Sequence, residues 1–177
     1  MQQTEGVCDI VDNAQKNTYV KSRIEDATIK LLVDHELDGL SVSLIAAEAQ
    51  VSRNAFYRNY ATKEDIVLSR VRRMYSDWEE SAGNGGGSNA NLFGGLFGHL
   101  SDNRDFYLLL ESRGLLHLLL QVMMEKSGPK KGYENLPAYV SAFVVHGTFG
   151  WIQEWMRRGM EESAQEMSAL LSSHGIA

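Results

Sequence analysis

Apolar side chains recur at intervals of three and four residues along most of this chain, which places them on one face of an α-helix. No segment shows a convincing alternation of apolar and polar residues, the pattern of a half-buried β-strand. Both prolines, Pro129 and Pro137, lie in one segment that reads as a loop, so no proline interrupts a helix elsewhere. The sequence therefore predicts an all-α protein.

Caps and breakers divide this pattern into separate helices. Ser41 and Ser52 are good N-caps, Thr62 with Asp65 matches a capping box, and Gly39 ends the first helical stretch. Residues 83–88 are rich in glycine and are expected to form a flexible connector. The expected helices cover residues 18–36, 42–49, 53–60, 62–81, 90–101, 104–126 with a break near Gly114, 136–159 and 162–173.

The charge of the chain is unevenly distributed. The 177 residues carry a formal net charge of −6, yet residues 50–75 hold six basic side chains and only two acidic ones. A compact basic stretch in an acidic protein indicates a local contact with a polyanion. The alternative is an ordinary solvated helix face.

Composition argues against several classes of protein. With 44% hydrophobic residues the chain is not disordered throughout, and the lone Cys8 excludes an internal disulfide framework. Residues 1–15 lack the basic side chains of a signal peptide, and no run of 18 apolar residues occurs, so we expect a soluble, cytoplasmic protein without a membrane contact. We identify no catalytic constellation and expect neither an enzyme nor a cofactor. We expect no metal site, because the histidines lack the spacing of a helical metal pair.

Residues 41–63 are the most informative about function. Two short helices joined by a three-residue turn can cross closely, because Ala46 and Ala49 are small. On the second helix, Ala55, Phe56 and Tyr60 are expected to point inward. The opposite face carries side chains that can read base edges or bind phosphates, namely Arg53, Asn54, Tyr57 and Arg58. This pattern predicts a helix-turn-helix motif at about 42–60, whose second helix enters the major groove of DNA.

The same stretch resembles the N-terminal domain of the TetR/AcrR family of bacterial transcriptional regulators. The resemblance rests on Ser41-Val42, Ile45-Ala46, Ala49-Gln50-Val51-Ser52, Phe56-Tyr57, Tyr60 and Lys63-Glu64-Asp65. Gln50 replaces the usual turn glycine, so it must adopt a left-handed conformation or the turn must be rebuilt. Tyr60 replaces a more common Phe and adds a hydroxyl. The predicted organisation is a disordered arm at 1–15, a helix-turn-helix domain at 16–62, and a C-terminal helical dimerisation and effector-binding domain at 63–177.

Roles at the DNA follow from this resemblance and from side-chain chemistry. Arg53 and Asn54 are expected to face base edges, since Arg pairs with guanine and Asn with adenine. The resemblance implies that Tyr57, Thr62 and Lys63 contact phosphates, although the Tyr can also be a packing residue. Ser43 is a further candidate for a phosphate, and Arg58 is compatible with either role.

The C-terminal half resembles one subclass of the family, which includes the regulator of a dihydroxyacetone kinase operon. The similarity lies in a small-residue helix followed by Trp, then Gly-Met, then a Ser that starts the last helix. A stripe of small and aromatic residues there is a candidate dimer interface: Val140, Phe143, Val144, Gly147, Trp151 and Trp155. The alternative is that this stripe belongs to the core of a monomer.

A site for an effector is a weaker prediction. Arg113, His117 and Gln121 are four residues apart and are expected to line a cavity together with Tyr107, Phe143 and His146. The alternative is that the stripe is the solvated side of a helix.

These predictions combine into one functional hypothesis. The chain is a sequence-specific, DNA-binding transcriptional regulator, namely a homodimeric repressor that binds double-stranded operator DNA and is released by a small-molecule effector. The alternatives are a TetR-like activator, a regulator without an effector, and a helical protein-interaction module with an incidental basic patch.

Overall fold

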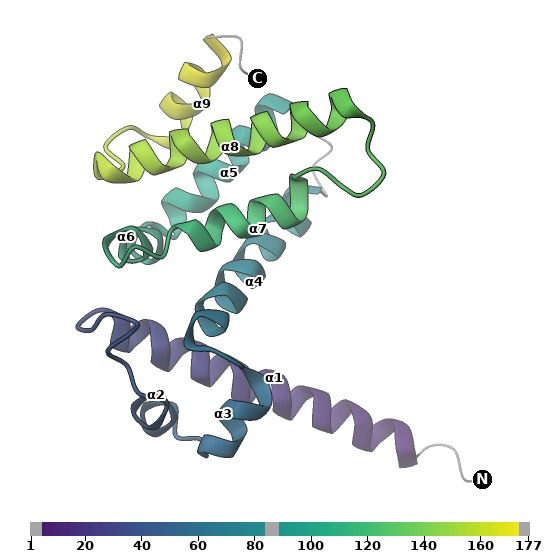
Figure 1. Ribbon diagram of the computed structural model, residues 1–177, viewed down its shortest axis with the longest axis vertical. Helices are drawn as coiled ribbons and strands as arrows, with labels where there is room; N and C mark the ends of the chain where they lie inside the picture. The colour runs from purple at the N-terminus through teal and green to yellow at the C-terminus, as the bar shows by residue number, and fades with distance from the viewer. Residues whose placement is uncertain (1–4, 84–88, 174–177) are drawn as a thin grey trace. The chain divides into compact units, whose positions relative to one another are not determined.

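The computed structural model describes residues 5–83 and 89–173, and within these ranges it contains nine helices and no strand (Figure 1). The prediction of an all-α fold is confirmed. The helices are α1 Glu5–Leu32, α2 Val42–Glu48, α3 Arg53–Asn59, α4 Lys63–Gly83, α5 Asn89–Asp102, α6 Arg104–Ser112, α7 His117–Ser127, α8 Asn135–Arg157 and α9 Ala164–Ser173. Of the connector predicted at 83–88, Gly83 is the last residue of α4 and 84–88 lie outside the described residues.

The chain forms two compact units, Met1–Arg70 and Val71–Ala177, which we call the first and second units. The division falls inside α4, eight residues beyond the boundary expected at 62–63. The first two turns of α4 group with the first unit because Ser69 and Arg70 bond to side chains of α1. We describe each unit by itself.

Helix α1 is longer than the sequence pattern predicts. It begins at Glu5, so the prediction of a disordered arm is wrong for residues 5–15, and residues 1–4 lie outside the described part. Residues 7–32 contain neither glycine nor proline, the two residues that most disfavour a helix interior. Acidic residues in the first turns, such as Asp9, also favour a helix N-terminus through the helix dipole.

The core of the first unit is apolar and closely packed. Apolar side chains from α1, α2, α3 and α4 are at most 1% exposed, among them Ile24, Leu32, Ile45, Phe56 and Ile66. Burial of each such side chain stabilises the fold by about 1.5–3 kcal/mol. Helices α2 and α3 both pack on α1, which fixes the orientation of α3 within this unit.

The second unit is a helical bundle in which α5 packs on α9, and α8 packs on both α6 and α7. Its innermost side chains come from α5, α6, α7 and α8: Phe97, Tyr107, Leu110, Leu119 and Ile152 are fully buried. Guanidinium and ammonium groups tie α4 to α7, because Arg72 binds Glu125 through two hydrogen bonds of 2.8 Å and Lys126 lies 2.8 Å from Glu79.

A predicted break near Gly114 separates α6 from α7. Gly114 has a φ of +67°, which glycine adopts without a steric penalty, and the two helices meet at an angle of 116°. Within the described residues, no single helix is both long and apolar enough for a membrane span. The bent α6–α7 pair meets those limits only when the two are joined, and six of its side chains are buried in the protein core.

Candidate nucleic-acid interface

Serine caps set the start of both short helices of the predicted motif. The Oγ of Ser41 accepts a hydrogen bond from the Leu44 N–H, and the Oγ of Ser52 accepts one from the Ala55 N–H, each at 3.1 Å. A cap of this kind stabilises a helix by about 1 kcal/mol. Because Ser52 fixes the N-cap, α3 begins at Arg53, as the sequence predicts.

Of the two alternatives that the sequence leaves for the turn between α2 and α3, the structure has the left-handed residue. Gln50 has a φ of +54°, a conformation that costs a residue with a Cβ roughly 1–2 kcal/mol. Its side chain is held by α1, since the Nη2 of Arg23 donates a hydrogen bond to the Gln50 Oε1 at 2.8 Å. The Val51 N–H donates to the Ala46 carbonyl at 2.9 Å and closes the turn. A side-chain contact thus supports a position that the resemblance assigns to glycine.

The two faces of α3 divide as the helical period predicts. Ala55 and Phe56 are buried, and Tyr60, the C-cap residue, is 5% exposed. The exposed face carries Arg53, Asn54, Tyr57 and Arg58. Three of these side chains, with Ser52, line a shallow open hollow: Asn54, Tyr57 and Arg58.

The arginines of α3 differ from the other arginines of the first unit. Arg23 binds Gln50, and Arg70 binds Asp26 at 2.8 Å. Arg53 and Arg58 have no hydrogen bond or ion pair with any residue that the structure describes, and α3 contains no acidic residue. Two uncompensated guanidinium groups on one exposed helix favour an external anion as their partner.

The N-terminus of α4 carries the predicted capping box. The Thr62 N–H donates to Asp65 Oδ2 at 2.8 Å, and the Asp65 N–H donates to Thr62 Oγ1 at 3.1 Å. Thr62 and Ser43, both predicted to bind phosphate, are exposed. Lys63 is half-buried and has a role that the sequence pattern missed, since its Nζ donates to the carbonyls of Asp38 and Leu40 at 2.8 and 3.0 Å. It therefore holds the turn before α2, and of its three N–H donors at most one is left for a phosphate.

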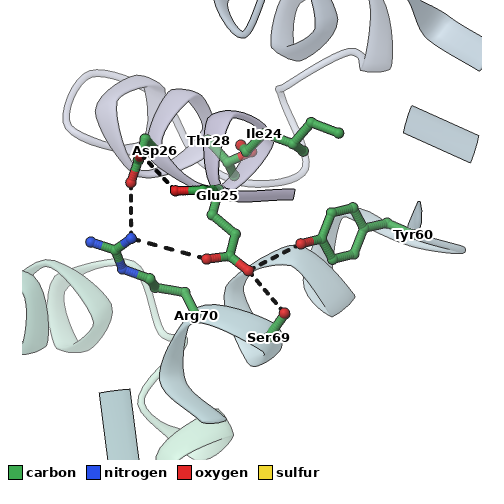
Figure 2. A network of polar contacts seen from close by, with 8 residues as sticks. Ile24, Glu25, Asp26, Thr28, Tyr60, Ser69 and Arg70 are labelled. Atoms are coloured by element: carbon green, nitrogen blue, oxygen red, sulfur yellow. Dashed lines mark hydrogen bonds and ion pairs between the residues drawn. The ribbon is translucent and has the colours of Figure 1, made fainter. Parts of the chain in front are cut away.

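A buried carboxylate joins α1 to both α4 and the end of α3 (Figure 2). Glu25 is 3% exposed, and its Oε1 accepts hydrogen bonds from the Tyr60 hydroxyl at 3.0 Å and the Ser69 hydroxyl at 2.9 Å. The guanidinium of Arg70 lies 4.0 Å from Glu25 Oε2 and 2.8 Å from Asp26 Oδ1. The sequence analysis missed this network, although the hydroxyl of Tyr60 and the position of Glu25 between Ile24 and Ala27 were signals of it.

Comparison with known proteins agrees with this geometry. The model of bacterial regulatory proteins of the tetR family matches residues 24–69, and a model described as a transcriptional regulator C-terminal region matches residues 90–174. Together the two matches cover about three quarters of the chain. The chain belongs to the TetR family. It is a DNA-binding transcriptional regulator with an N-terminal helix-turn-helix and a helical C-terminal region, as predicted.

Two solved structures share the fold of this TetR-family chain. One is the fatty acid degradation regulator FadR from Bacillus halodurans, with a TM-score of 0.52 and 17% identity over 86% of this chain and 94% of that one. The other is the dihydroxyacetone kinase operon activator DhaS, with a TM-score of 0.50 and 19% identity over 87% of this chain and 92% of that one. No curated protein matches the chain at a significant level.

In the second unit of this TetR-family chain, most of the predicted interface stripe lies on the surface of α8. Phe143 is 73% exposed and Val140 51%, and the stripe extends to Leu136 and Tyr139, which the sequence analysis did not include. Val144 is exposed, and Gly147 and Trp151 are half-buried. Trp155 does not belong to this surface. It is 2% exposed, its ring lies edge-on to Phe97, and its Nε1 donates to the Glu162 carbonyl, so it is a core residue.

The predicted effector cavity is not formed by the residues assigned to it. Arg113 caps α6 while His117 begins α7, so the break at Gly114 separates two members of the expected stripe. Tyr107 is fully buried, and its hydroxyl lies 2.9 Å from His99 Nε2. The remaining candidates are exposed to solvent: His117, Gln121, Phe143 and His146. Among the side chains that the structure describes, no three His, Cys, Asp or Glu residues are placed to hold a metal ion.

Proposed function

We propose that this TetR-family regulator binds operator DNA as a homodimer and represses transcription. One observation carries the proposal, namely that α3 exposes Arg53, Asn54 and Arg58 on the face opposite its buried Phe56, with both guanidinium groups uncompensated within the described chain. In the major groove, Arg53 and Asn54 would read base edges, and Tyr57 would bind a phosphate.

The exposed apolar stripe of α8 supports the homodimer. One helix-turn-helix reads only a few base pairs, so two copies are needed to read half-sites about 34–36 Å apart. Side chains such as Phe143 and Val140 lose their water shell when they pair across a two-fold axis, and α8 and α9 of two copies would form a four-helix bundle.

Release by a small effector is the part of the proposal that rests on the family. Helix α4 is continuous from the first unit into the second and is about 30 Å long by its rise of 1.5 Å per residue. An effector that binds the second unit and displaces α4 would move the bonded first unit with it. The spacing of the recognition helices would then depart from one turn of DNA, with a coupling of roughly 1–3 kcal/mol.

The test starts from DNA selected by the protein itself. Duplexes enriched from a randomised pool are titrated with the wild-type chain, and with a scrambled duplex for comparison. Arg53→Ala and Asn54→Ala should each reduce discrimination between the two by about 1–3 kcal/mol. Tyr57→Phe should weaken binding to both duplexes by a similar factor. The matched control is Arg157→Ala, an exposed arginine of the second unit, which should change neither.

Two results would contradict the proposal. If no duplex is enriched, the chain does not recognise sequence. If Arg53→Ala and Tyr57→Phe reduce discrimination equally, the faces of α3 are misassigned. A reporter gene placed behind the selected duplex then separates repression from activation.

A further inference from the structure

A second hollow in the first unit lies between α1 and α3. Its lining comes from Lys16, Asn17 and Val20 of α1 and from Arg58 and Asn59 of α3. Four of these five side chains carry N–H donors, two of them carry a positive charge, and none of the lining residues whose side chains the structure describes is acidic. Such a lining matches an anion with several oxygen atoms.

The local structure holds these side chains in place. Lys16 and Val20 are four residues apart on α1, so they share one face of that helix. The Nδ2 of Asn59 donates to the Ala55 carbonyl at 2.7 Å, which fixes the amide against α3. Arg58 lines both this hollow and the one lined by Asn54 and Tyr57.

The geometry of DNA identifies the anion. The major groove is about 12 Å wide, and a helix with its side chains is about 10–12 Å across. A helix inserted into the groove therefore has a phosphate backbone along each side. When Arg53 and Asn54 face the bases, a hollow on the flank of α3 faces one of these backbones.

We propose that Lys16, Asn17 and Arg58 bind a backbone phosphodiester of DNA beside the recognition helix. This inference rests on the proposed function and assigns Arg58 to a phosphate instead of a base. It also makes α1 part of the DNA interface.

The experiment measures the salt dependence of binding. A duplex selected by the wild-type chain and a scrambled duplex are titrated at several salt concentrations with wild type, Lys16→Ala and Arg58→Ala. Loss of one phosphate contact lowers the slope of log K against log salt by about 0.9, and the proposed homodimer loses one contact at each of its two half-sites. We expect this decrease in slope for both variants. Each variant should also weaken binding to the selected and the scrambled duplex by a similar factor. Lys131→Ala removes the same charge from an exposed loop of the second unit, and it should leave the slope at the wild-type value.

A second measurement locates the contact. Single phosphates of the selected duplex are replaced in turn by neutral methylphosphonates. Replacement of one particular phosphate should weaken DNA binding by the wild-type chain but should not weaken binding by Lys16→Ala any further. The same replacement should also cause no further loss of binding by Arg58→Ala. Asn17→Asp, which places a negative charge in the hollow, should weaken binding more than Asn17→Ala.

The outcomes separate this inference from the proposed function. Failure of the wild-type chain to select any duplex contradicts the proposed function. A wild-type slope in Lys16→Ala overturns the phosphate site while operator binding stands. An equal decrease of the slope in Lys131→Ala also overturns the phosphate site, because the decrease then reflects the net charge of the protein and not a local contact. Circular dichroism of each variant checks that the helices are retained.

Discussion

Replacement of Tyr60 by Phe removes one hydroxyl from the buried carboxylate of Glu25 and changes nothing else in size or shape. Glu25 is 3% exposed, and one of its oxygens accepts hydrogen bonds from Tyr60 and Ser69 at 3.0 and 2.9 Å. The guanidinium of Arg70 is 4.0 Å from the other oxygen, so it compensates little for a lost hydroxyl. A hydrogen bond to a charged group contributes about 1.5–3 kcal/mol, and we expect Tyr60→Phe to destabilise the first unit by that amount.

The assay can distinguish the two units. All three tryptophans, Trp78, Trp151 and Trp155, belong to the second unit, so tryptophan fluorescence reports its unfolding, whereas circular dichroism at 222 nm reports both units. In urea denaturation, Tyr60→Phe should lower the midpoint seen by circular dichroism more than the midpoint seen by fluorescence. The double variant Tyr60→Phe/Ser69→Ala should lose more than the sum of the two single losses, because both hydroxyls serve one oxygen.

Tyr57→Phe is the matched control. Tyr57 lies on the same helix and is 56% exposed, so loss of its hydroxyl should change stability by less than about 0.5 kcal/mol while weakening DNA binding. The reasoning is refuted if Tyr60→Phe is as stable as wild type, or if the two variants lose equal stability.

Three further predictions concern other parts of the chain. Gln50→Gly should be near wild-type stability, because relief of the left-handed conformation offsets loss of the Arg23 contact. Gln50→Ala should be less stable than Gln50→Gly by about 1 kcal/mol in urea denaturation. The reverse order of stability would refute this reasoning. Burial lowers the pKa of His99, and Asp102 and Asp77 oppose that shift only in part. Below about pH 6.5 the unfolded state therefore binds more protons than the folded state, and the second unit should lose stability as the pH falls toward 5. His99→Gln should flatten this pH dependence in the fluorescence-detected transition, and an unchanged profile would contradict the assignment. Phe143→Asp should sediment as a folded monomer, whereas Gln153→Asp on the same helix should remain dimeric; a dimer in both cases would place the interface elsewhere.

The helix-turn-helix was predictable because local chemistry determines it. Ser41, Ser52 and Thr62 each cap a helix in the structure, and the helical period alone places Phe56 inside and Arg53 outside. For Gln50, the sequence left two alternatives, a left-handed residue or a rebuilt turn, and the structure has the left-handed residue. These features depend on residues close together in sequence, and spacing therefore reveals them.

The missed features depend on contacts between distant residues. Lys63 reaches the carbonyl of Asp38, and Glu25 reaches the hydroxyl of Tyr60, 35 residues away. Trp155 shares a helix with an exposed stripe, but the packing of α5 against α8 decides that it is buried. The effector stripe failed because the break at Gly114 places Arg113 at the end of α6 and His117 at the start of α7, so the two do not share one helix face. Periodicity gives the faces of one helix, and it does not say which second helix covers them.

The exposed stripe of α8 has a consequence for handling and synthesis of this protein. Leu136, Tyr139 and Phe143 are each 70% exposed or more in the single chain, so every newly made copy presents them to water, and under the proposed pairing they stay exposed until a second copy binds. Under the proposed pairing, dilution shifts the equilibrium toward single chains and returns these side chains to water. Handling and storage of this protein are therefore best done at high concentration.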